Sequence, residues 1–96
     1  IGNVLRYGWP EHWIEVLNKR IVKLHGKEFS RKKMNDEGLW KGFDVPFLEG
    51  DVDWTKVMQS LREVNYKGEW LTLELSAGDR TYLKTLSEKM DKILSL

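Results

Sequence analysis

Basic side chains occupy the alternate positions 23, 25 and 27 within RIVKLHGKEF, residues 20 to 29, a segment that otherwise has the composition of a β-strand. Side chains alternate between two faces along a strand. One face therefore carries Lys23, His25 and Lys27, whereas Leu24 belongs to the opposite, apolar face. This pattern predicts a strand that is covered by helices on one side and faces a polar site on the other.

A second segment, EWLTLEL at residues 69 to 75, repeats the arrangement: Glu74 is on the polar face, and the leucines are on the apolar face. His25 and Glu74 each sit near the carboxyl end of their predicted strand. Neighbouring strands lie about 4.8 Å apart, which brings two such side chains within reach of one divalent ion. The alternative is a hydrogen-bonded histidine beside a solvated glutamate.

Helical signals flank both segments. Pro10 suits the first turn of a helix over residues 10 to 18, and Asp53 suits the N-cap of a helix that runs to about residue 65. Asp79 caps a third predicted helix, which has one apolar stripe as far as residue 94. Residues 29 to 51 show no regular period and are predicted to form a long loop.

Strands that alternate with helices indicate right-handed crossovers and parallel pairing, so the fold class is α/β. Two parallel strands alone leave open edges and do not make a stable sheet. Polar residues at strand ends are typical of a (β/α)8 barrel, whose chemistry lies at the carboxyl mouth. We therefore expect residues 1 to 96 to be a single incomplete domain: the C-terminal portion of a TIM barrel, with about two βα units and a preceding helix.

The composition argues against several classes of partner. A net charge of +1 gives no broad basic field for nucleic acid, and the run Arg31 to Lys33 is read as a solvated loop or as a contact to a small phosphate. The chain contains no cysteine, which excludes thiolate metal sites and fits a reducing compartment. No apolar stretch approaches the roughly 20 residues of a membrane span, and no secretion signal opens the sequence, so a cytoplasmic location is expected.

Lys27 lies nearer the expected mouth and is the candidate for substrate contact, whereas Lys23 is expected to form a structural ion pair. Trp9 and Trp40 fall in predicted loops, where they either face a sugar or simply pack. His12, on a predicted surface helix, is expected to be inert.

Four stretches together resemble the C-terminal third of the sugar phosphate isomerase/epimerase family, the xylose isomerase-like TIM barrels. They are GNVLRYGWPEHW, RIVKLHGKEF with its H-x-K-[DE] pattern, VPFLEGDVDWTKVMQSLREVNYKG and WLTLEL. Gly26 and the stretch 48 to 50 depart from the usual family pattern.

The resemblance implies a divalent metal ion (Mn, Mg, Co or Zn) with His25 and Glu74 among its ligands. Glu74 would also act as an acid/base group, Asn3 and Lys27 would contact the substrate, and two further carboxylate ligands would precede Ile1. The implied activity is isomerisation or epimerisation of a sugar or sugar phosphate by proton transfer through an enediolate, with these residues alone being inactive.

The sequence is compatible with two other functions. One is a non-catalytic module that completes its sheet by forming a homo-oligomer. The other is a relative of abasic-site endonucleases, which is ranked last because their metal cluster needs many histidine and acidic ligands and the chain has 2 histidines.

Overall fold

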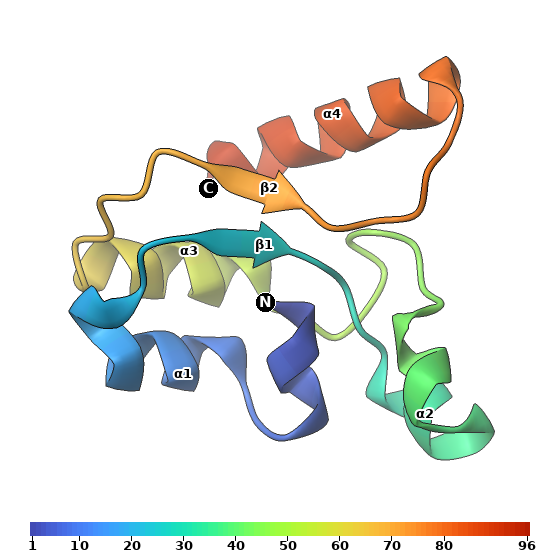
Figure 1. Cartoon of the computed structure of the whole chain (residues 1–96), viewed down its shortest axis with the longest axis horizontal. Coiled ribbons are helices and arrows are strands. Elements are labelled where there is room, and N and C mark those ends of the chain that lie inside the picture. Colours follow the sequence, from blue (N-terminus) through green and yellow to red (C-terminus); the bar gives the residue numbers. More distant parts are fainter.

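The computed structural model describes residues 1 to 96 and shows a small mixed α/β structure (Figure 1). Short 3-10 helices separate several of its elements. In chain order the elements are η1 (Gly2–Arg6), α1 (Pro10–Leu17), η2 (Asn18–Arg20), β1 (Leu24–Gly26), α2 (Arg31–Glu37), η3 (Leu39–Phe43), α3 (Trp54–Glu63), β2 (Leu71–Leu73) and α4 (Arg80–Leu94).

The sheet consists of β1 and β2, which pair in parallel, as predicted. Leu24 lies opposite Leu71 and His25 lies opposite Thr72. Both strands are shorter than predicted, because regular pairing extends over only three residues of each. Each strand pairs only with the other, so both strands are edge strands of the sheet.

The three long helices form where the sequence predicts them. Pro10 occupies the first turn of α1. The Asp53 side chain accepts a hydrogen bond of 3.1 Å from the Lys56 amide at the start of α3, and Asp79 accepts one of 2.8 Å from the Tyr82 amide at the start of α4. These caps satisfy backbone N–H groups that a helix start leaves without partners.

The prediction of a structureless loop over residues 29 to 51 is wrong, because α2 and η3 lie within it. Ser30 caps α2 by accepting a 3.2 Å hydrogen bond from the Lys33 amide, and Gly38 ends the helix with φ of 114°. The helix contains no buried residue and therefore lacks the apolar stripe that reveals longer helices. Its cap and its terminal glycine were the available sequence signals.

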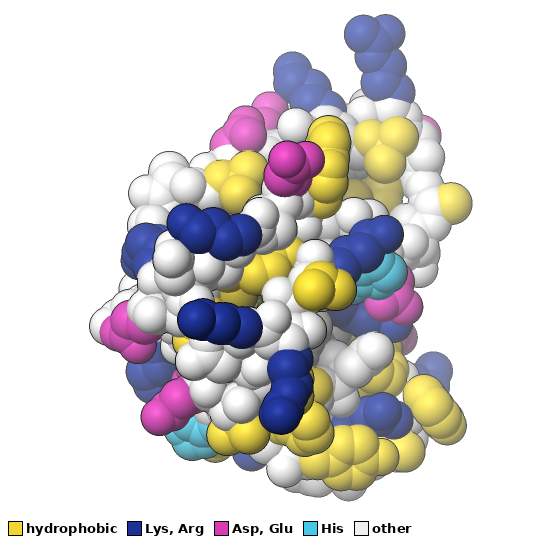
Figure 2. Space-filling view, turned by 60° about the vertical axis from the view of Figure 1, so that its left-hand side comes forward, with side chains coloured by type: hydrophobic (Ala, Val, Ile, Leu, Met, Phe, Trp, Pro, Cys, Tyr) yellow, Lys and Arg dark blue, Asp and Glu magenta, His cyan; other side chains and the backbone are white.

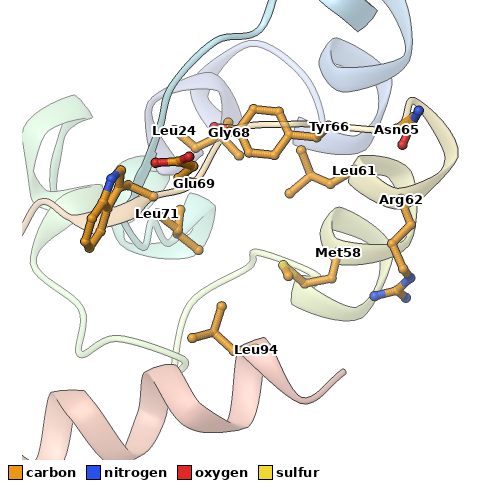
Figure 3. A pocket seen from close by; sticks show the side chains of 11 residues that line it. Leu24, Met58, Leu61, Arg62, Asn65, Tyr66, Gly68, Glu69, Leu71 and Leu94 are labelled. Atoms are coloured by element: carbon orange, nitrogen blue, oxygen red, sulfur yellow. The ribbon is translucent and has the colours of Figure 1, made fainter.

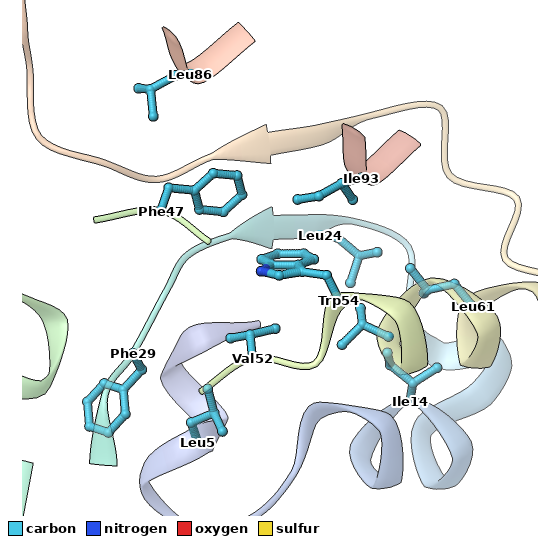
Figure 4. Packing of buried hydrophobic residues seen from close by; sticks show 11 residues of the cluster. Leu5, Ile14, Leu24, Phe29, Phe47, Val52, Trp54, Leu61, Leu86 and Ile93 are labelled. Atoms are coloured by element: carbon cyan, nitrogen blue, oxygen red, sulfur yellow. The ribbon is translucent and has the colours of Figure 1, made fainter. Parts of the chain in front are cut away.

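Helices α1, α3 and α4 supply most of the core, which packs against the Leu24 face of the sheet (Figure 4). The core also includes residues from the segments on either side of η3. Its members are Leu5, Ile14, Leu24, Phe29, Phe47, Val52, Trp54, Val57, Leu61, Leu86 and Ile93. The predicted alternation is thus confirmed, since Leu24 is buried and His25 is exposed.

The prediction of a TIM-barrel portion is wrong. The structure has only a two-stranded sheet and four α-helices, and the His25 face of the sheet is open, with the imidazole 49% exposed. A barrel encloses its inner face by closing eight tilted strands on themselves. Two strands with three residue pairs cannot enclose a face, so His25 of β1 and Lys23 before it are exposed to solvent.

The surface seen in Figure 2 carries both signs of charge, with hydrophobic side chains exposed between them. No α-helix has the length together with the apolar composition needed to cross a lipid bilayer.

Candidate functional site

Three charged or titratable side chains converge at the carboxyl ends of the two strands. Glu74 follows β2, and its backbone amide donates a 2.8 Å hydrogen bond to the Gly26 carbonyl, which continues the ladder past the strand end. Lys27 Nζ lies 2.9 Å from Glu74 Oε1, and His25 Nδ1 lies 3.5 Å from Glu74 Oε2. The strands therefore bring an ammonium and an imidazole to one carboxylate.

The neighbouring groups hold Glu74 in its ionised form. The hydrogen bond from Lys27 and the charge of that ammonium lower the pKa of the Glu74 carboxyl, and His25 adds a smaller effect in the same direction. Glu74 is thus a carboxylate over the whole neutral range. Such a group is ready to accept a proton and needs no prior deprotonation.

We expect replacement of Lys27 by methionine to raise the pKa of Glu74 back toward its ordinary value of 4.5. Because the folded-state pKa is the lower one, the ion pair adds stability above about pH 4.5, and this contribution is lost as the pH falls through the folded-state pKa. NMR titration of the Glu74 side-chain carboxyl carbon measures the shift. Lys23→Met is the matched control, because Lys23 is exposed and forms no ion pair; an unchanged Glu74 midpoint in the Lys27 variant would contradict the assignment.

Lys27 and Glu74 line a cavity of about 590 Å³ at this end of the sheet. Its other lining residues come from the segment between β1 and α2, from the end of η3 and the segment after it, from the chain after β2 and from the first turn of α4. They are Glu28, Phe43, Asp44, Val45, Pro46, Phe47, Leu75, Ser76 and Tyr82. The cavity wall thus contains one basic group, Lys27, and three carboxylates, those of Glu28, Asp44 and Glu74. The His25 imidazole does not line the cavity but contacts Glu74.

Glu28 organises one wall of the cavity and was not singled out from the sequence. The residue is 2% exposed, and its carboxylate accepts four hydrogen bonds. The donors are the backbone amides of Phe29, Leu48 and Val52 and the indole N–H of Trp54, at 3.1 to 3.3 Å. Leu24, Gly26 and Glu28 alternate along the chain, so Glu28 falls on the apolar face of the strand. A carboxylate on an apolar face was the sequence signal that this side chain is buried and hydrogen-bonded.

Two further contacts fix the same wall from outside. Lys89 of α4 donates a 2.7 Å hydrogen bond to the Phe47 carbonyl and lies 3.4 Å from a Glu49 carboxylate oxygen. Leu48 has a positive φ of 72°, which is uncommon for a residue with a branched side chain. Residues held in this way are common at binding sites, where surrounding contacts impose the conformation.

The other residues for which the sequence predicted contacts do not line the cavity. The Asn3 side chain is exposed, makes no hydrogen bond and does not line the cavity, so its role stays a prediction. Lys23 is exposed without the ion pair expected for it. Arg31 donates to the carbonyls of Leu5 and Gly8 and lies over the Trp9 ring, 3.9 Å from its centroid, which makes both side chains structural.

No family model, no curated protein and no solved structure matches the chain.

A second hollow of about 340 Å³ lies near the start of β2, between the strands, α3 and the end of α4 (Figure 3). Its walls are mainly apolar, including Leu61, Leu71 and Leu94, with Arg62 and Glu69 as its charged members. No titratable side chains are paired there. The Lys27–Glu74 cavity is therefore the better candidate for proton-transfer chemistry than this apolar hollow.

The donor set of this chain is too small for a metal centre of its own. His25 and Glu74 supply one nitrogen and one carboxylate, whereas catalytic zinc sites use three protein ligands. No group of three or more His, Cys, Asp or Glu side chains is arranged to hold a metal ion. The Lys27 ammonium also lies against Glu74 Oε1. A divalent cation would need further ligands from another polypeptide segment or a second copy.

Proposed function

We propose that Glu74, Lys27 and His25 belong to the active site of an isomerase or epimerase that moves a proton on an open-chain sugar or sugar phosphate. The observation that supports this most directly is the meeting of the three side chains at the carboxyl ends of parallel strands, with two of them lining a cavity. The cavity volume of about 590 Å³ falls within the usual range for small-molecule sites.

In this proposal Glu74 removes the proton from the carbon next to the substrate carbonyl. In isomerisation it returns that proton to the adjacent carbon on the same face, whereas in epimerisation a second acid/base group on the opposite face of the enediolate returns a proton. The carbon next to the carbonyl is a weak acid, so the negative charge that develops on the carbonyl oxygen must be stabilised as it forms. Lys27 is the cation beside Glu74. When substrate binds, Lys27 would donate its hydrogen bond to the substrate oxygen in place of the carboxylate. This change would stabilise the enediolate and would also make Glu74 a stronger base.

His25 Nδ1 lies 3.5 Å from Oε2 of the same carboxylate, so the imidazole contacts the carboxylate oxygen that Lys27 leaves free. The divalent metal ion implied by the resemblance, Mn, Mg, Co or Zn, would polarise the carbonyl oxygen when bound. Since this chain provides two candidate ligands, His25 and Glu74, the proposal places the remaining ligands outside these residues and takes no step through the metal.

Deuterium exchange tests the proposal without knowledge of the final product. The protein, in the longest polypeptide that carries this chain, is incubated in D2O with ketose and aldose sugars and their phosphates, with and without each metal. We expect deuterium to enter at the carbon next to the carbonyl, because proton removal precedes either isomerisation or epimerisation. No exchange above the uncatalysed rate with any of these substrates would refute the proposed reaction.

A second candidate function is a non-catalytic module that completes its sheet by association. It is favoured by the open face and the two-stranded sheet, and by the 82% exposure of Val22 and the 75% exposure of Trp70 at the starts of the strand segments. Light scattering over a range of concentrations separates the two. A discrete homo-oligomer without proton exchange favours the module, and a monomer rules it out.

A further inference from the structure

A cluster of cationic and aromatic side chains lies next to the Lys27–Glu74 cavity and takes no part in the chemistry above. The guanidinium carbon of Arg6 lies 4.9 Å from the centroid of the Tyr7 ring, 5.5 Å from that of Trp40 and 5.9 Å from that of Phe43. Lys27 Nζ lies 4.6 Å from the Phe43 centroid. We call Arg6, Tyr7, Trp40 and Phe43 the Arg6 cluster.

Phe43 connects this cluster to the cavity, because it lines the cavity and contacts both cations. The rings of Trp40 and Phe43 are stacked, with an interplanar angle of 28° and centroids 6.2 Å apart. Both Arg6 and Trp40 come from 3-10 helices, η1 and η3, whose lengths are only five residues each. The cluster is thus built from segments far apart in sequence that meet at the cavity edge.

Arg6 is held in place but not neutralised. Its Nε donates a 3.2 Å hydrogen bond to the Asn3 carbonyl, and it forms no ion pair with a carboxylate. The two terminal guanidinium nitrogens therefore remain available as donors. A planar guanidinium binds the oxygens of a phosphate or carboxylate in bidentate fashion, which makes arginine well suited to oxyanions.

The aromatic members leave a large apolar surface in water. Trp40 is 72% exposed and Tyr7 is 74% exposed, and both rings lie close to the Arg6 guanidinium. Exposed aromatic groups gathered beside an unpaired cation are typical of recognition sites, where a ligand covers the ring faces. The C–H groups of a sugar backbone offer a suitable apolar face for such rings.

We propose that the Arg6 cluster is an oxyanion subsite of the Lys27–Glu74 cavity. Its ligand is an acidic sugar derivative, whose phosphate or carboxylate binds Arg6 while the carbon chain crosses Phe43 toward Glu74. This inference rests on the proposed function for the identity of the sugar part, and it adds that the substrate carries a negative charge. Both sources of that charge, a phosphate ester and a sugar acid, share the same chemistry at Arg6.

The test is binding measured by calorimetry for three matched ligands: a sugar phosphate, the corresponding sugar acid and the neutral sugar. We expect the wild-type protein to bind at least one acidic ligand about tenfold or more tightly than the neutral sugar, since charge-assisted hydrogen bonds to arginine are strong. Arg6→Gln should remove this preference, and Arg6→Lys should retain part of it. Arg20→Gln is the control, because Arg20 is exposed, lies in η2 before β1 and makes none of the cation–aromatic contacts of the cluster.

A tryptophan signal adds a second measurement. An acidic ligand should shift the Trp40 indole N–H resonance in NMR spectra of the wild-type protein, and this shift should disappear in Arg6→Gln while the rest of the spectrum remains that of a folded chain. Equal affinity for acidic and neutral sugars, or an acidic preference that survives in Arg6→Gln, would overturn the subsite.

The outcome is separable from that of the proposed reaction. Arg6-dependent binding without deuterium exchange would sustain the subsite and refute the isomerase or epimerase. Deuterium exchange on neutral sugars that does not depend on Arg6 would sustain the isomerase or epimerase and refute the subsite.

Discussion

Replacement of Glu28 by glutamine is expected to lower the free energy of unfolding by about 3 kcal/mol. Each carboxylate oxygen accepts two N–H donors in the folded chain. A glutamine amide keeps one accepting oxygen but directs an NH2 group at two of those donors, which leaves buried N–H groups without acceptors. The expected loss is a large share of the roughly 5 to 15 kcal/mol that stabilises an ordinary domain.

Urea denaturation of the wild type and the variant measures this difference, and the Trp54 indole N–H, which bonds to Glu28 directly, gives a local NMR signal. Glu15→Gln is the matched control, since Glu15 is exposed on α1 and should change the stability by less than about 0.5 kcal/mol. Equal stability of the Glu28 and Glu15 variants would mean that the four hydrogen bonds do not organise the wall.

Replacement of Glu74 by glutamine is expected to reduce the rate of deuterium exchange at least about 100-fold, because the amide cannot accept the substrate proton. The side chain is 46% exposed, so the fold should tolerate the change. Glu69→Gln serves as the control, because Glu69 is an exposed glutamate just before β2 and does not line the cavity. The measurement is the initial rate of exchange at saturating substrate.

Lys27→Met separates the two roles assigned to this pair. If Lys27 stabilises the enediolate, its loss should lower the exchange rate even though Glu74 becomes a more basic carboxylate. Near-normal exchange in Glu74→Gln would remove Glu74 from the chemistry, whatever the result for Lys27.

Helices and strands that carry local sequence signals could be predicted from the sequence. Asp53 and Asp79 mark the starts of α3 and α4, and the apolar stripes that follow indicate which helical faces are buried. Strand alternation placed His25 and Glu74 on one side of the sheet, and the structure brings them within 3.5 Å of one another. These features depend on residue spacing within a segment or on the period of a strand.

The parts that were not predicted depend on contacts between distant segments. Alternation fixes which face of β1 is polar, but it does not determine how many strands join the sheet, and the barrel prediction failed for that reason. The cavity wall depends on Glu28 reaching Leu48 and Val52, which are 20 and 24 residues away. The Arg6 cluster likewise joins η1 to η3, a pairing for which neither segment carries a local signal.

The bond from Lys89 to the Phe47 carbonyl joins two segments 42 residues apart. One end belongs to a long regular helix, and the other belongs to an irregular stretch that would ordinarily exchange its amide protons quickly. Because this bond joins them, α4 and the stretch around Phe47 should open together when part of the fold unfolds. The backbone amides of residues 48 and 52 should therefore exchange with solvent as slowly as those of α4. Access to the cavity would then be governed by the stability of the last helix.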